Sequence, residues 1–117
     1  MKKLLFILVS FTVFPVSLSA DETQTEAYVA ILVEIKSPEK FEHFLTQAAP
    51  IVKAYQGEIV AKGDSRLLVE GQLNLDLLVV ARFPSEAAVD KFYGSEEYLR
   101  LLPVRNEAAN VSILKLR

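Results

Sequence analysis

The chain has 117 residues, a formal net charge of −2 and no cysteine. Without cysteine it has no disulfide framework and no thiol chemistry. Its slightly acidic balance argues against a nucleic-acid partner, because such partners usually need a basic protein surface.

Residues 1–20 have the pattern of a secretory signal peptide. A basic head at Lys2 and Lys3 precedes a mostly apolar run, and small residues end the segment. The alternative is a transmembrane anchor, but the apolar run of about 13 residues is too short to span a bilayer comfortably. No cysteine follows the run, which excludes a lipoprotein anchor. We therefore expect a periplasmic or secreted protein with no stable membrane anchor.

The cleavage site is less sharply defined than the segment. Ser17 and Ser19 fit the small-x-small pattern for cleavage after Ser19, whereas cleavage after Ala20 would place the bulky Leu18 at the outer small position. Removal of residues 1–20 leaves one small domain, residues 21–117. It removes two of the 13 basic residues and none of the 15 acidic ones, so the net charge becomes −4.

The first half of this domain predicts a strand followed by a long helix. Residues 27–35 are predicted to form a strand that is covered on both sides, because both alternating faces are mostly apolar. Ser37 is expected to cap a helix that reaches to about Gln56, with Pro50 on its solvent side. Gly57 is expected to close this helix in the left-handed conformation.

The second half predicts three further strands around a helical region. Residues 58–62 form a short strand, residues 67–69 a small extension, and residues 77–83 a buried strand. A helical region over residues 85–109 precedes a last strand over residues 111–116. Within it, Ser85 and Ser95 are expected to cap helices, Gly94 to take the left-handed conformation, and Pro103 to begin a new turn.

This element order, β-α-β-β-α-β, indicates an α+β protein with the ferredoxin-like arrangement. Such a sheet carries helices on one face only. The other face is here too apolar to lie in water, so we expect a second subunit to cover it, giving a homodimer.

Several short motifs occur together in the domain. They are Pro38-x-x-Phe41, Tyr55-x-Gly57, Phe83-Pro84-Ser85, Ala87-Ala88, Phe92-Tyr93-x-Ser95-x-Glu97-Tyr98, Leu102-Pro103-x-Arg105 and Ala108-Ala109. From about residue 28 to residue 116, this pattern resembles the domain-of-unknown-function 1330 family. The resemblance implies a dimeric α/β barrel, in which two sheets face one another across a central space. It implies no established activity, since related barrels include cofactor-free monooxygenases, haem-dependent enzymes and structural stress proteins.

The chain departs from the family pattern at two places. Members usually carry an acidic residue before Phe-Pro-Ser, where this chain has Arg82, and they often have two glycines where this chain has Gln56-Gly57. The first departure places any acid-based role at this position in doubt.

Arg82 is one candidate for ligand binding. Strand alternation places it on the face opposite Phe83, toward the space between two sheets. Because the first and third strands of such a sheet are neighbours, Glu34 is expected near it. The pair would be either a structural ion pair at the barrel mouth or a site where Arg82 binds a carboxylate ligand.

Tyr93, Tyr98 and Arg105 follow the family pattern and form a second candidate group. The two tyrosines either pack in the core with hydrogen-bonded hydroxyls or line a pocket for a small polar ligand. Arg105 either pairs with Glu96, Glu97 or Glu107, or caps helix-end carbonyls, or contributes its guanidinium to that pocket.

His43 is the single histidine, and its helical position lies away from the apolar stripe. It is either solvent-exposed or a general base or metal ligand. One histidine without cysteine makes a metal site or a haem improbable, so we expect no cofactor.

The sequence has no phosphate-cradling glycine loop, no nucleophile elbow and no paired acid–base motif. This argues against hydrolase and kinase chemistry. Two hypotheses remain: an exported dimer that binds a small organic ligand in the barrel, or a cofactor-free monooxygenase- or isomerase-like enzyme. Whether the protein is an enzyme stays open.

Overall fold

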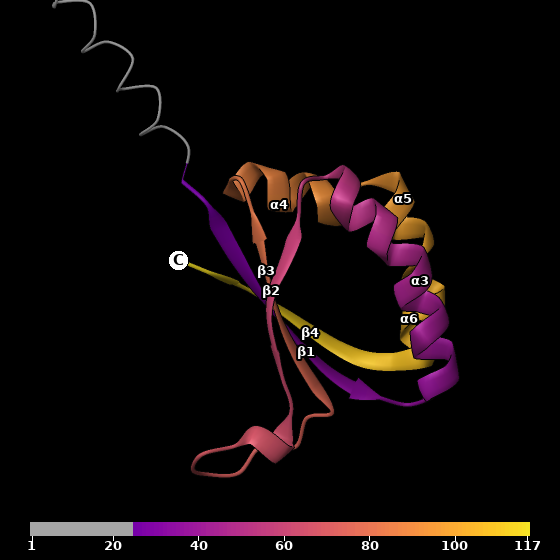
Figure 1. Ribbon diagram of the computed structural model, residues 1–117. Coiled ribbons are helices and arrows are strands. Elements are labelled where there is room, and N and C mark those ends of the chain that lie inside the picture. Colours follow the sequence, from indigo (N-terminus) through magenta and orange to yellow (C-terminus); the bar gives the residue numbers. More distant parts are fainter. Residues whose placement is uncertain (1–24) are drawn as a thin grey trace, which may run out of the picture.

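The computed structural model describes residues 25–117, so the predicted signal peptide lies outside the described range. These residues form a four-stranded antiparallel sheet with the strand order β2-β3-β1-β4. The strands are β1 (Ala27–Ile35), β2 (Glu58–Gly63), β3 (Leu77–Phe83) and β4 (Ala109–Leu116). Figure 1 shows all the α-helices on one side of this sheet. The predicted α+β, ferredoxin-like arrangement is confirmed.

The helical layer consists of one long helix and three short ones. They are α3 (Pro38–Ala54), α4 (Glu86–Tyr93), α5 (Glu96–Arg100) and α6 (Leu102–Ala108). Serine side chains cap three of them: the Oγ atoms of Ser37, Ser85 and Ser95 accept hydrogen bonds from backbone N–H groups three residues later. These caps were predicted, as was the new turn at Pro103, which lies in the first turn of α6.

The predicted strand extension over residues 67–69 is wrong. A 3₁₀ turn, η2 (Ser65–Leu67), begins the loop between β2 and β3 instead. The Asp64 side chain accepts from the Arg66 N–H at 2.8 Å, and the Ser65 hydroxyl accepts from the Leu75 N–H at 2.9 Å. These side chains accept hydrogen bonds from backbone N–H groups of the loop, which in a strand would bond to a neighbouring strand.

Two glycines, Gly57 and Gly94, donate to helix-end carbonyls as expected, but neither has the expected left-handed backbone. Gln56, rather than Gly57, is in the left-handed region, with φ of 66°. Gly57 is required for space, since a Cβ there would lie 2.7 Å from the Phe83 ring. Gly94 has φ of −95° and so does not use the conformational freedom of glycine.

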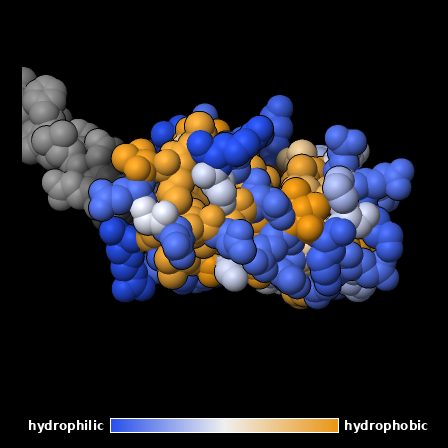
Figure 2. All heavy atoms as spheres, turned by 90° about the horizontal axis from the view of Figure 1, so that it is seen from below, coloured by the Kyte–Doolittle hydropathy of each residue, from blue (hydrophilic) through white to orange (hydrophobic). Residues whose placement is uncertain are grey.

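The two faces of the sheet have different surroundings. Val29 and Val33 of β1 are buried beneath the helices, at 0% and 2% exposure. Their neighbours along the strand point to the opposite face, where Ala30 lies between Val80 of β3 and Leu114 of β4. This open face has no covering element among the described residues. In Figure 2, apolar atoms reach the surface mainly in the left half of the view, and polar atoms dominate the right half.

The outer strand β4 ends beside the start of β1. Tyr28 lies opposite Leu116 in the antiparallel pair. At the other end of the sheet, the backbone N–H groups of Lys36 and Ser37 donate to the Ala108 carbonyl at 2.8 and 3.0 Å. These bonds fix the start of α3 against the end of α6.

Within residues 25–117, no helix combines the length and the apolar character needed to cross a bilayer.

Candidate functional site

A pocket of about 530 Å³ lies between the helices and the sheet. Its floor is the helix-facing side of the strands, including Ile31, Val79 and Ala81, and one wall is the inner face of α3. The hydrophobic core therefore does not fill the whole space between the two layers. We call this the helix–sheet pocket.

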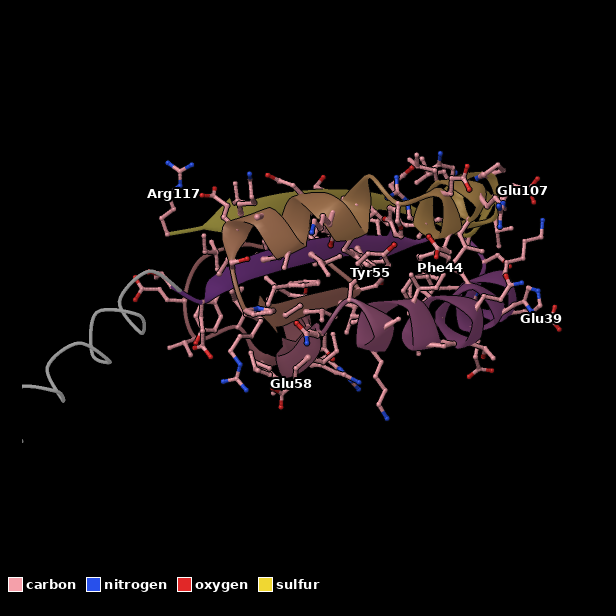
Figure 3. The ribbon with its side chains drawn as sticks, turned by 90° about the horizontal axis from the view of Figure 1, so that it is seen from above. Glu39, Phe44, Tyr55, Glu58, Glu107 and Arg117 are labelled. Atoms are coloured by element: carbon pink, nitrogen blue, oxygen red, sulfur yellow. The ribbon has the colours of Figure 1, made fainter. Side chains whose placement is uncertain are left out.

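Small side chains in α3 explain part of this space. The buried stripe of the helix begins with Phe41 and Phe44, but the next buried residue is Ala48, which lines the pocket together with the exposed Ala49. An alanine leaves room that a leucine or phenylalanine would fill. Figure 3 shows Phe44 and Tyr55 between α3 and the other helices, while the labelled charged residues lie at the periphery.

A cluster of aromatic side chains closes one part of the pocket. Phe92 is at its centre, with ring centroids 5.5 Å from Phe83, 5.0 Å from Tyr98 and 4.7 Å from Tyr93. The Tyr93 and Tyr98 rings meet edge to face, 5.1 Å apart. This packing fixes both phenol rings in the pocket lining.

Arg105 adds the only guanidinium to the described lining of the helix–sheet pocket. Its Nη1 donates to the Tyr98 hydroxyl at 2.7 Å, and its Nε and Nη2 donate to Asn106 Oδ1 at 3.3 and 3.1 Å. The expected pairing with a nearby glutamate is wrong, since no ion pair of Arg105 occurs among residues 25–117. The predicted grouping of Tyr93, Tyr98 and Arg105 around one pocket agrees with their positions.

Burial raises the pKa of Tyr93 above that of an ordinary phenol, which is already neutral at physiological pH. Desolvation is the largest cause that raises the pKa of its phenol, and the neighbouring Tyr98 raises it further, while Arg105 lowers it by less. The phenol is therefore neutral at physiological pH. It is a hydrogen-bond donor there, and not a base.

Arg82 lies on the other side of the sheet, away from this pocket. Its Nη2 contacts Glu58 Oε1, and its Nε lies 3.8 Å from Glu26 Oε2. The hydrogen bond to Glu58 is the largest cause that raises the pKa of Arg82.

The expected pair of Arg82 with Glu34 is wrong. The β1–β3 register places Tyr28 opposite Arg82, and Glu34 lies six residues further along β1. Glu34 instead lines an open hollow of about 700 Å³, together with Asp64 and Asp76, and forms no ion pair among the described residues. The two candidates therefore do not form one site.

His43 is exposed on α3 and does not line the helix–sheet pocket. Within residues 25–117, no group of three or more His, Cys, Asp or Glu side chains is placed to hold a metal ion. The sequence analysis did not identify Lys53 and Lys62, which also line the pocket. The small Ala48 in the α3 stripe was a sequence signal that this part of the core is hollow.

The fold is that of a ferredoxin-like α+β protein, with a pocket between its helices and its sheet. The chain belongs to the family described as "Domain of unknown function (DUF1330)", whose model matches residues 26–116. No match was found among curated proteins.

Solved structures support the fold assignment. A protein of unknown function from Rhodopseudomonas palustris has a TM-score of 0.67 and 18% identity, with 88% of this chain and 91% of that chain covered. SnoaB, a cofactor-independent oxygenase from Streptomyces nogalater, has a TM-score of 0.59 and 14% identity, with 79% of this chain and 91% of that chain covered. A dimeric ferredoxin-like protein of unknown function from Jannaschia has a TM-score of 0.62 and 11% identity, with 80% of this chain and 99% of that chain covered. At these identities the likeness establishes the fold alone.

Proposed function

We propose that the protein binds a small, largely apolar organic molecule in the helix–sheet pocket, and that it does so as an exported homodimer. The observation that carries this proposal is a pocket of about 530 Å³ lined mainly by apolar side chains, together with two tyrosines, two lysines and one arginine. This size and composition are typical of small-molecule sites, which usually span roughly 300–1,000 Å³. The proposed location differs from the space between two sheets that was expected from the sequence.

Binding can be tested with Nile red, a neutral fluorescent probe, and a variant that fills the pocket. Ala48→Phe adds a ring on the buried, pocket-lining side of α3, whereas Ala87→Phe adds the same ring on the exposed side of α4. We expect one probe per chain in the wild type and in Ala87→Phe, and no binding in a folded Ala48→Phe variant. Unchanged binding by Ala48→Phe would show that the probe occupies another surface.

The open face of the sheet supports the homodimer. Ala30, Val80 and Leu114 form an apolar row across three strands, and Leu114 is 58% exposed. Burying a leucine or valine side chain contributes about 1.5–3 kcal/mol, so several such residues per subunit would hold two copies together. The Jannaschia neighbour is itself described as dimeric.

Sedimentation equilibrium tests this arrangement. We expect a dimer at micromolar concentration that Leu32→Asp or Val80→Asp separates into monomers or unfolds. Val69→Asp provides the control, because Val69 is 98% exposed in the β2–β3 loop, away from the sheet. A monomeric wild type, or a dimer that tolerates both sheet substitutions, would contradict the proposed interface.

Export rests on the sequence of residues 1–20. N-terminal sequencing of the protein recovered from the periplasm or the medium should give a chain that begins at Ala20 or Asp21. An intact Met1 in the membrane fraction would contradict it.

A second candidate is a cofactor-free oxygenase- or isomerase-like enzyme, favoured by the fold shared with SnoaB and by the phenols and guanidinium of the pocket. The described lining has no His, Asp or Glu, and the raised pKa of Tyr93 keeps its phenol neutral. The lining therefore has no evident general base at neutral pH. Native mass spectrometry followed by incubation in air separates the candidates, because a retained ligand that is converted indicates an enzyme.

A further inference from the structure

The charged groups of the helix–sheet pocket all have the same sign. Its described lining contains Lys53, Lys62 and Arg105 and no acidic side chain. The chain as a whole is acidic, with 15 acidic and 13 basic residues, so its overall composition does not explain this cationic lining.

Arg105 differs from the other arginines in the described part of the chain. Arg66, Arg82, Arg100 and Arg117 each pair with a carboxylate, whereas Arg105 is half-buried and has only neutral partners. A partly desolvated guanidinium gains most from a carboxylate or a similar anion, which it binds through charge-assisted hydrogen bonds.

The hydroxyl beside Arg105 can supply a further donor. Tyr98 accepts the 2.7 Å bond from Arg105 through its oxygen, and a hydroxyl that accepts still has its own proton to donate. The neutral Tyr93 phenol lies next to it and has the same capacity. The polar part of the pocket thus combines one positive charge with two O–H donors, while its floor is apolar.

We infer that the ligand of the helix–sheet pocket is an amphipathic organic anion, with a carboxylate bound by Arg105 and Tyr98 and an apolar body over the sheet. This inference rests on the proposed function and specifies the ligand class of the same site. Lys53 and Lys62 add positive charge to the lining and favour the approach of such an anion.

Calorimetric titration of the purified protein with two isosteric probes tests the inference. Naphthalene-2-carboxylate carries the proposed charge, and naphthalene-2-carboxamide is its neutral counterpart. We expect the carboxylate to bind at least about tenfold more tightly, as hydrogen bonds to charged groups usually provide. Arg105→Met should remove this preference, so that the carboxylate and the carboxamide bind with similar affinities, and far-UV circular dichroism should show that the variant is folded.

Two further variants complete the test. Arg105→Lys keeps the charge without the planar fork and should retain part of the preference for the carboxylate. This variant tests the role of the charge even if Arg105→Met does not fold. Lys91→Met removes a positive charge from the exposed side of α4, outside the pocket lining, and should leave both affinities unchanged. Equal affinities in the wild type, a preference that survives in Arg105→Met, or no binding of the carboxylate would each overturn the inference. If Nile red still binds in the pocket, the proposed function stands despite such a result.

Discussion

Arg105 and Tyr98 connect two short helices through one hydrogen bond of 2.7 Å between the guanidinium and the phenol oxygen. Tyr98 lies in α5 and Arg105 in α6, and helices of five and seven residues have few internal bonds of their own. The bond therefore contributes to the arrangement of the helical layer as well as to the lining of the pocket.

Tyr98→Phe tests the structural part of this contribution. The phenylalanine keeps the ring packing and removes the acceptor, so we expect the ligand-free protein to lose about 1 kcal/mol of unfolding free energy. Tyr93→Phe is the matched control, since the Tyr93 hydroxyl makes no hydrogen bond within residues 25–117 and should contribute less. Urea denaturation followed by circular dichroism gives both values. Equal losses would mean that the Arg105 bond has no effect on stability.

Gly57→Ala should destabilise the protein. The added Cβ would lie 2.7 Å from two atoms of the Phe83 ring and 2.9 Å from Val52, and Phe83 is only 1% exposed. Overpacking of this kind costs about 1–3 kcal/mol. Gly63→Ala is the control, because its nearest contact would be Leu67 at 3.9 Å. A difference below the error of the urea midpoints would contradict the space requirement at Gly57.

Gln56→Gly should stabilise the protein. Gln56 has φ of 66°, where a side chain costs roughly 1–2 kcal/mol. The greater freedom of glycine in the unfolded chain offsets part of the gain, leaving about 0.5–1 kcal/mol. The thermal midpoint should rise accordingly, and Gln47→Gly, within α3, should lower it. Destabilisation by Gln56→Gly would indicate that its side chain makes a compensating interaction.

Asp64 should titrate well below an ordinary aspartate. Its hydrogen bonds with the Arg66 side chain and N–H are the main causes that lower its pKa from 3.8 to about 2. Because the folded-state pKa is depressed, the carboxylate contributes stability above the ordinary pKa, and this contribution is lost as the pH falls from 3.8 toward about 2. Carboxyl chemical shifts measured by NMR should report this pKa.

The same titration has a direct control. Arg66→Met should move the pKa of Asp64 upward, whereas Arg100→Met removes a guanidinium that pairs with Glu96 in α5 and should leave it unchanged. An unchanged pKa in Arg66→Met would assign the shift to another group.

The strands and helix caps were predictable because they depend on local patterns. The alternating apolar residues around Val29 and Val33 identify a strand, and a serine before a helical stripe, such as Ser85, identifies a cap. The roles of Gly57 and Gly94 were not predictable in the same way. A glycine can serve a left-handed backbone or a close contact, and only the position of the Phe83 ring distinguishes these at Gly57.

The candidate site was predicted only in part, since it depends on distances across the fold. Tyr93, Tyr98 and Arg105 are close in sequence and meet at the pocket through consecutive short helices. The partner of Arg82 depends on strand register, which places Tyr28 rather than Glu34 opposite it. The volume of the pocket depends on how far α3 stands from the sheet, a quantity that the apolar stripe of the helix does not specify.

The pairing of Tyr28 with Leu116 brings the two ends of the described chain together at one end of the sheet. Figure 1 shows the start of β1 and the C-terminus at the same side of the molecule. A short flexible linker can therefore join Arg117 to Thr25, and new termini can be opened at Val69, which is 98% exposed in the β2–β3 loop. Such a circular permutant would keep all three strand pairings, because exposed loop tips tolerate new termini. It would also place both new ends far from the residues that pair β1 with β4.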